Sequence, residues 1–204
     1  DGNVIQDKSR TNSFKISLSS KDKDWLELIQ HEFEGEGRLK QTKGNQYELR
    51  LYNKKIYDWL IQHGCTPRKS LSLTMPNIPE QYFKDFLRGC MDGDGSISIT
   101  RYKATKNAKT YSTISIYLCG SSLDFIRSIS EKLNKLGLKH NLLTINTEKN
   151  HINGKLIGSK NPNYRIQFSG RKRGTPFLEW LYHDCKLAMP RKQNLAIKIL
   201  NNDF

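Results

Sequence analysis

The chain has 204 residues, of which 36% are hydrophobic, so it can form one domain or two small ones with a real core. Lys and Arg number 34 against 20 Asp and Glu, which gives a formal net charge of +14. No stretch is apolar enough for a membrane span and no secretion signal is visible, which disfavours membrane and secreted proteins. The basic residues are spread along the chain, and this favours a folded surface that binds a polyanion, most simply nucleic acid. A merely basic protein or a membrane-surface binder is the alternative.

The four cysteines predict neither zinc binding nor a disulfide framework. They are Cys65, Cys90, Cys119 and Cys185, which lie far apart and form no Cys-x-x-Cys pair. We therefore expect reduced thiols in an intracellular protein.

The first part of the chain alternates short strands with amphipathic helices. Strands are predicted over residues 12–19, 38–42 and 46–52, and helices over residues 21–34 and 54–62. Gly35 and Gly64 end the two helices. The segment 65–78 contains Pro67 and Pro76 and is predicted to be a linker.

Residues 79–95, PEQYFKDFLRGCMDGDG, form the most distinctive stretch. Pro79 suits the first position of a helix, and an apolar stripe follows at helical spacing: Phe83, Phe86, Leu87, Cys90 and Met91. The helix runs into Gly93-Asp94-Gly95, and a period-two segment begins directly afterwards. The helix thus carries the Asp94 carboxylate to its C-terminal end. A helix C-terminus disfavours an acid by about 0.3–1 kcal/mol, and a bound cation would reverse that preference.

Two other structures could place an aspartate between two glycines. One is an ordinary turn, for which Asp-Gly is a common dipeptide. The other is a calcium loop, which Ile97 and Lys103 exclude because they stand where glycine and a glutamate ligand are needed.

The chain after Asp94 repeats the pattern of the chain after Asp1. Strands are predicted over residues 96–102, 111–119, 139–147 and 164–169, and helices over residues 122–136, 176–182 and 190–200. Loops are expected over residues 103–110 and 150–163. DGNVIQ at the start matches DGSISI after the motif helix, and a Pro-Arg-Lys segment ends each half, at Lys69 and at Lys192. This internal repeat makes Asp1 the counterpart of Asp94.

Residues 87–95, LRGCMDGDG, align position by position and without a gap with the LAGLIDADG motif. With the repeat, the chain resembles the single-chain, two-repeat LAGLIDADG homing endonucleases. The resemblance implies an α+β fold of two pseudo-symmetric αββαββα halves, residues 1–76 and 77–204, that form a DNA-binding saddle. Its motif helices would pack together, where Gly89 and Gly93 suit close contact. The first half begins at Asp1, so its motif helix is expected to precede these residues, unless two chains pair instead.

The resemblance also implies a mechanism. The protein would be a site-specific, metal-dependent endonuclease that cuts both DNA strands, leaves 3′ overhangs and is encoded in an intron. Asp94 and Asp1 would hold Mg²⁺, or Mn²⁺, or Ca²⁺ in a non-cleaving complex, with the Gly93 carbonyl as a further ligand. Lys192 and Lys69 would stabilise transition-state charge. Contact with the DNA backbone or helix capping explains these lysines equally well, and Asp92 is expected to be structural.

The polar faces of the strands are expected to read DNA bases. The residues assigned to this role are Ser96, Ser98, Thr100, Tyr102, Lys15, Ser17, Arg38, Lys40, Glu48, Arg50, Arg165 and Gln167. The alternative is that the alternation marks only solvent exposure. The partner would be double-stranded DNA, bound by a monomer inside the cell, in a cytoplasm or an organelle. A non-cleaving binder is the alternative function, either an intron RNA maturase with intron RNA as partner or a LAGLIDADG-type regulator.

Overall fold

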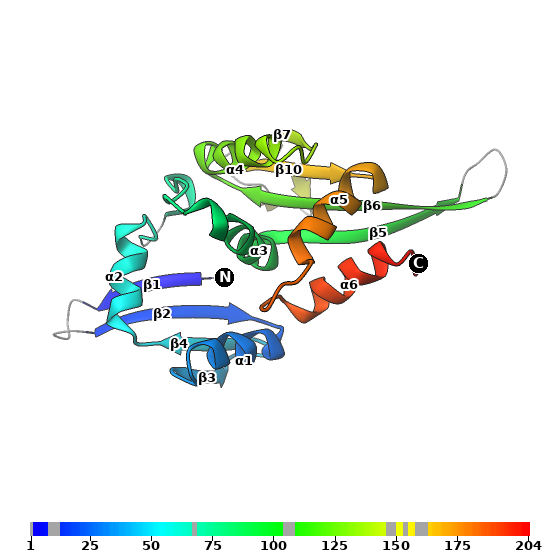
Figure 1. The fold of residues 1–204 in the computed structure, drawn as a ribbon. Helices are drawn as coiled ribbons and strands as arrows, with labels where there is room; N and C mark the ends of the chain where they lie inside the picture. Colours follow the sequence, from blue (N-terminus) through cyan, green and yellow to red (C-terminus); the bar gives the residue numbers. More distant parts are fainter. Residues whose placement is uncertain are drawn as a thin grey trace. The chain divides into compact units, whose positions relative to one another are not determined.

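The computed structural model describes residues 2–7, 13–66, 69–103, 109–145, 150–152, 155–157 and 163–204. The chain forms two compact units (Figure 1). Unit 1 comprises Asp1–Lys69 and Cys185–Arg191, and unit 2 comprises Ser70–Asp184 and Lys192–Phe204. None of the described helices is long and apolar enough to cross a membrane.

Unit 1 is a four-stranded antiparallel sheet with two helices packed on one face. Its strands are β1 (Gly2–Asp7), β2 (Ser13–Ser20), β3 (Arg38–Gln41) and β4 (Tyr47–Leu51), in the order β1-β2-β4-β3. The helices are α1 (Lys23–Glu32) and α2 (Lys54–Gln62). Every second strand residue points to the helices, so Ile16, Leu49 and Leu51 meet Leu26 of α1 and Tyr57 of α2 in the core.

Unit 2 repeats this arrangement on a larger scale. Its main sheet contains β5 (Gly95–Lys103), β6 (Thr110–Gly120), β10 (Asn163–Ser169) and β7 (Asn141–Ile145), in that order. Its helices are α3 (Phe83–Asp94), α4 (Leu123–Lys135), α5 (Arg171–Tyr182) and α6 (Pro190–Leu200), of which α6 begins in unit 1. Short elements complete the chain: η1 (Lys69–Leu71), η2 (Glu80–Tyr82), and the strand pair β8 (Asn150–Ile152) and β9 (Lys155–Ile157).

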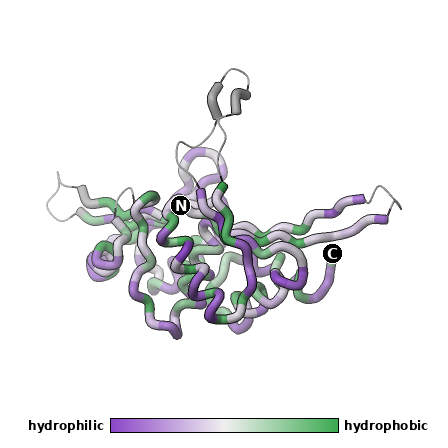
Figure 2. Tube along the Cα trace, turned by 90° about the horizontal axis from the view of Figure 1, so that it is seen from above, coloured by the Kyte–Doolittle hydropathy of each residue, from purple (hydrophilic) through white to green (hydrophobic). Residues whose placement is uncertain are grey.

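The core of unit 2 lies between its sheet and its helices. Ile114 and Ile116 of β6 are buried under α5, and Phe168 of β10 stacks on Phe177 of α5 with ring centroids 3.9 Å apart. Gly174 makes this close packing possible, because a Cβ atom there would lie 2.6 Å from Cδ1 of Ile114. Among the described residues, no helix packs on the other face of the sheet. Most of the β5–β6 hairpin is drawn pale or green in Figure 2, since Ser, Thr, Tyr and Ile dominate its sequence.

The strand orders confirm the predicted α+β repeat. β1, β2, β4 and β3 of unit 1 correspond in order to β5, β6, β10 and β7 of unit 2. In both units a helix follows the second strand and another follows the last strand of the repeat, so α1 matches α4 and α2 matches α5. The predicted helix over residues 54–62 has the predicted bounds.

The predicted and observed elements differ most in three places. The helix expected at residues 176–182 begins at Arg171, because packing of Gly174 against β6 outweighs the single hydrogen bond that Pro176 removes. The motif helix begins as the 3₁₀ turn η2 and becomes α-helical at Phe83. The expected loop over residues 150–163 contains the β8–β9 pair.

Candidate active site and nucleic-acid interface

The C-terminal end of α3 delivers an exposed carboxylate to the start of β5. Phe83, Leu87 and Met91, spaced four residues apart, bury one side of the helix. Asp94 is its last residue and is exposed to solvent. The turn into β5 requires glycine, because a Cβ atom at Gly95 would lie 2.6 Å from the Met91 carbonyl oxygen. The sequence thus fixes Asp94 at a sharp helix-to-strand junction.

Lys192 caps this helix end. Its side chain is buried, and Nζ donates to the carbonyl oxygens of Met91 (2.7 Å), Asp92 (2.8 Å) and Gly95 (2.6 Å). Three acceptors match the three donors of an ammonium group. The cation also offsets the negative end of the helix dipole beside Asp94. The Lys192 ammonium group therefore places a positive charge at the helix end that carries Asp94.

Three side chains spaced four residues apart fasten α3 to the end of α5. Lys84 Nζ donates to the His183 carbonyl oxygen at 2.7 Å, and Arg88 Nη1 donates to the Leu181 carbonyl oxygen at 2.9 Å. Asp92 accepts a 3.0 Å hydrogen bond from the Tyr182 hydroxyl. The two cations satisfy carbonyl groups at the C-terminus of α5, where the helix dipole favours them.

The helix-free face of the unit 1 sheet is strongly basic. The strand register places these residues on it together: Lys15 and Ser17 of β2, Arg38 and Lys40 of β3, and Glu48 and Arg50 of β4. Glu48 accepts from Ser17 Oγ at 2.8 Å and from Arg50 Nη2 at 2.7 Å. The Arg50 hydrogen bond, aided by Ser17, lowers the pKa of Glu48 from 4.5 to about 2. Ser17 is buried, so it positions this carboxylate.

The helix-free face of the unit 2 sheet is mostly neutral. It carries Ser96, Ser98, Thr100 and Tyr102 of β5, Thr113, Ser115 and Tyr117 of β6, and Arg165 and Gln167 of β10. The Arg165 guanidinium lies over the Tyr117 ring, 4.2 Å from its centroid. The rings of Tyr102 and Tyr111 stack at 5.8 Å near the end of the β5–β6 hairpin.

Solved structures share this fold over the whole chain. The LAGLIDADG meganuclease I-AabMI bound to uncleaved DNA is 12% identical, with a TM-score of 0.61 over 99% of this chain and 86% of that chain. The meganuclease I-SmaMI, a LAGLIDADG homing endonuclease, bound to uncleaveable DNA with a TTGT central four is 13% identical, with a TM-score of 0.59 over 100% of this chain and 86% of that chain. The chain has the LAGLIDADG homing endonuclease fold.

A third structure with the LAGLIDADG fold was solved in the presence of metal ions. It is I-SmaMI bound to an uncleaved DNA target in the presence of calcium ions, 12% identical, with a TM-score of 0.57 over 99% of this chain and 87% of that chain. No family model and no curated protein matches the chain. At these identities the similarity establishes the fold, and the chemistry depends on the residues themselves.

Within this LAGLIDADG fold, three of the predicted catalytic or metal-binding residues lie at one helix end. Asp94, Gly93 and Lys192 meet at the C-terminus of α3. Asp1 and the side chain of Lys69 lie outside the described residues. Lys192 has the arrangement expected of a helix cap, the alternative that its sequence position left open. Asp92 is buried and bonded to Tyr182, as suits a structural residue.

The donor set at this end of the LAGLIDADG motif fits a hard divalent cation. The exposed Asp94 carboxylate offers oxygen, and the Gly93 carbonyl is not among those that Lys192 binds. No group of three or more His, Cys, Asp or Glu able to hold a metal occurs among the described residues. A metal here would take its remaining ligands from water, from phosphate or from residues beyond those described.

All twelve predicted DNA-contacting residues lie on the helix-free sheet faces of this fold. Sequence reasoning missed Tyr111, Tyr117 and Leu143, which share these faces. The alternation of β6 contained a signal for the two tyrosines, because the predicted hairpin sets Tyr111 beside Tyr102. The hydrogen bonds from Lys84 and Arg88 to the end of α5 could not be found from the sequence pattern, because they join segments about a hundred residues apart.

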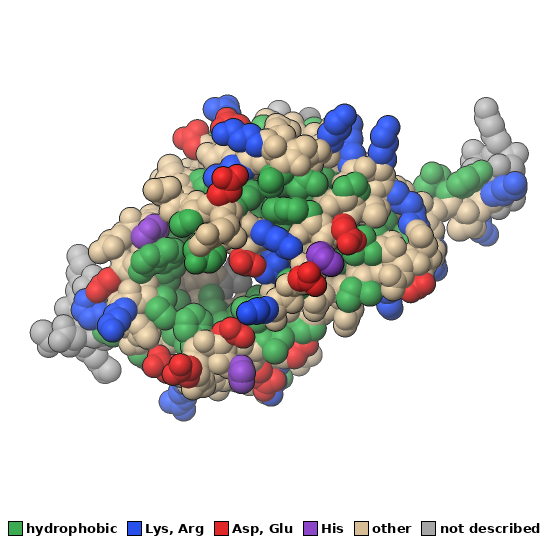
Figure 3. Space-filling view, viewed as in Figure 1, with side chains coloured by type: hydrophobic (Ala, Val, Ile, Leu, Met, Phe, Trp, Pro, Cys, Tyr) green, Lys and Arg blue, Asp and Glu red, His purple; other side chains and the backbone are tan. Residues whose placement is uncertain are grey.

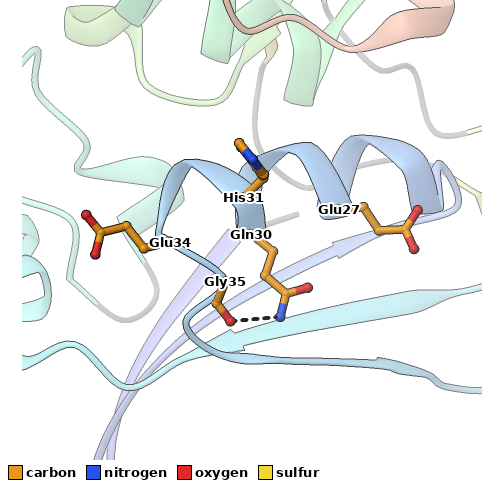
Figure 4. A pocket seen from close by; sticks show the side chains of 5 residues that line it. All are labelled: Glu27, Gln30, His31, Glu34 and Gly35. Carbon is orange, nitrogen blue, oxygen red and sulfur yellow. Dashed lines mark hydrogen bonds between the residues drawn. The ribbon is translucent and has the colours of Figure 1, made fainter.

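The helix side of unit 1 is a poor surface for nucleic acid. A shallow hollow on the exposed side of α1 is lined by Glu27, Gln30, His31, Glu34 and Gly35 (Figure 4). Its two carboxylates would repel phosphate. Lys and Arg side chains are otherwise spread over much of the surface shown in Figure 3.

Proposed function

We propose that this chain is a site-specific DNA endonuclease that cuts both strands with the help of a divalent metal. The observation that carries the proposal is the exposed Asp94 at the tip of a helix that is buried on one side, at the edge of a sheet with a polar, helix-free face. Structures of the same fold, I-SmaMI and I-AabMI, are bound to DNA. The net charge of +14 suits a polyanionic substrate.

The roles of the residues follow from their chemistry. Asp94 would hold the metal through its carboxylate, with the Gly93 carbonyl as a second oxygen donor. The metal, when bound, would neutralise charge on the scissile phosphate and make a water molecule nucleophilic. Lys192 would act through the α3 carbonyl groups, because it fixes the helix end on which Asp94 sits. Asp1 is proposed as the second, repeat-related carboxylate.

The sheet faces would bind the DNA major groove, and the product would be a double-strand break with 3′ overhangs. We propose Mg²⁺ as the metal, and an intron-encoded, monomeric protein that works inside the cell. Arg, Lys, Gln and Ser on these faces can pair with base edges, and the remaining cations would hold phosphates.

The test uses the full-length protein, a library of randomised DNA duplexes and Mg²⁺ or Mn²⁺. A discrete double-strand cut at one family of sequences is expected, and Asp94→Asn should abolish cleavage but retain binding in Ca²⁺. Glu131→Gln, on an exposed face of α4, is the matched control and should cut normally. Binding without cleavage in either metal would overturn the proposed endonuclease activity. Promotion of the splicing of a parent intron would identify a maturase instead.

A further inference from the structure

We infer that the two sheets read DNA of different composition: unit 1 reads a G·C-rich half-site through arginine, and unit 2 reads an A·T-rich half-site through neutral side chains. The inference rests on the proposed function, in which each sheet face lies in a DNA major groove. The difference in charge between the two helix-free sheet faces supports this inference.

The unit 1 face presents two arginines side by side. Arg38 and Arg50 are directly opposite each other on neighbouring strands, so their side chains share a face. Like charges in this position repel each other in the free protein. An acceptor-rich ligand relieves that repulsion. The guanine edge offers two acceptors, N7 and O6, which match the paired donors of a guanidinium group.

Glu48 holds one of these arginines in place. Its carboxylate is engaged by Ser17 on one oxygen and by Arg50 on the other, and Lys40 lies 3.8 Å from that second oxygen. A carboxylate that already has three partners has little capacity left to accept a hydrogen bond from the amino group of cytosine. It acts instead as a support that limits the rotamers of Arg50, so a base contact by Arg50 loses less entropy.

The unit 2 face offers a different set of groups. Arg165 is its one charged side chain among the described strand residues, and the guanidinium is occupied by the Tyr117 ring and by Cys119 Sγ, which accepts from Nε at 3.4 Å. Directly opposite Arg165 on the edge strand β7 is Leu143, a residue that is 39% exposed. An apolar group on such a face suits the thymine methyl group, and the nearby Gln167 suits adenine.

The length of the β5–β6 hairpin supports this contrast. The hairpin extends the neutral face through the paired Thr100 and Thr113 to the stacked tyrosines, Tyr102 and Tyr111. Threonine methyl groups and tyrosine rings add apolar contact without adding charge. Unit 2 is therefore expected to depend on thymine methyl groups more than unit 1 does.

The experiment replaces single atoms of the DNA. A duplex is first selected by binding to the protein in Ca²⁺, and binding is then measured to versions of it in which 7-deazaguanine removes N7, or uracil removes the thymine methyl group, in one half-site at a time. Arg50→Ala identifies the half-site that unit 1 reads, as the one in which base preference changes. We expect 7-deazaguanine to weaken binding about tenfold in that half and less than threefold in the other. Uracil should show the opposite asymmetry.

Variants assign the effects to residues. Arg50→Ala should remove the 7-deazaguanine effect at one position, Glu48→Gln should reduce it, and Leu143→Ala should remove the uracil effect at one position. Arg127→Ala, exposed on α4, is the control and should leave base preference unchanged. Equal effects in both halves would overturn the inference, as would a uniform loss of affinity with Arg50→Ala, which marks a phosphate contact. Failure to bind any duplex would instead refute the proposed function.

Discussion

Lys192 donates a 2.7 Å hydrogen bond to the carbonyl oxygen of Met91, one turn before the catalytic candidate Asp94. Two further carbonyl groups of the same helix end accept from the same ammonium. The orientation of Asp94 therefore depends on a buried cation contributed by a distant helix.

Lys192→Met should destabilise unit 2. The change leaves buried carbonyl groups without their donor, at a cost of about 2–3 kcal/mol in the free energy of unfolding. Denaturant unfolding of the full chain measures the loss. Lys198→Met, at an exposed position on the same helix, should cost less than about 0.5 kcal/mol. Equal stability of the two variants would show that the cap contributes nothing.

The hydrogen bond between Tyr182 and Asp92 predicts coupled substitutions. Tyr182→Phe removes the donor to a buried carboxylate and should cost about 1–2 kcal/mol, and Asp92→Ala, which removes the acceptor, should cost at least as much. Because both variants remove the same interaction, the double variant should cost clearly less than the sum. Strictly additive losses in a double-mutant cycle would contradict this.

Gly95 should tolerate no side chain. Gly95→Ala places a Cβ atom 2.6 Å from a backbone oxygen, so α3 and β5 must move apart, with an expected loss of about 1–3 kcal/mol and a displaced Asp94. Asn134→Ala, at an exposed position in the α4 helix, is the comparison. This second variant should leave the free energy of unfolding unchanged or raise it by up to about 1 kcal/mol. A neutral Gly95→Ala variant would show that the junction is loose.

Glu48 makes unit 1 sensitive to acid. The pKa of this carboxyl is about 2 in the folded chain, against an ordinary value of 4.5, because Arg50 and Ser17 donate to it. A lowered folded-state pKa stabilises the fold fully above about pH 4.5, and this contribution is lost as the pH falls toward 2. The protection factors of the amides in β2 and β4, which correct for the intrinsic pH dependence of hydrogen exchange, should fall over that window in the wild type. Glu48→Gln should show a smaller fall at matched pH, and identical profiles would rule the mechanism out.

Local patterns were sufficient for most of the fold. The helix over residues 54–62 combines a capping asparagine, Asn53, with an apolar stripe, and the strand alternation identified which of Ile114, Ser115 and Ile116 are buried. The repeat then predicted two related halves, and the two sheets do share one strand order. These features depend on neighbours within a few residues, which a sequence displays directly.

The contacts that complete the site were not predictable in this way. The hydrogen bond from Lys192 to Met91 spans 101 residues, and the local pattern on either side of it does not indicate that the two residues meet. The sequence suggested a metal to explain an acid at a helix C-terminus, and the structure adds a lysine whose ammonium group binds carbonyl groups at the same helix end. The start of α5 was missed because Gly174 and Pro176 weaken the local helical signal, and packing on β6 compensates for them.

The separation of Lys192 from α3 also governs the order in which the protein can mature. During synthesis the motif helix leaves the ribosome about a hundred residues before the lysine that caps it. A nascent chain can pair β5 with β6 early, since those strands are neighbours, but the end of α3 stays uncapped until α6 has emerged. The candidate catalytic carboxylate therefore takes its final position late, after the sheet face beside it has formed.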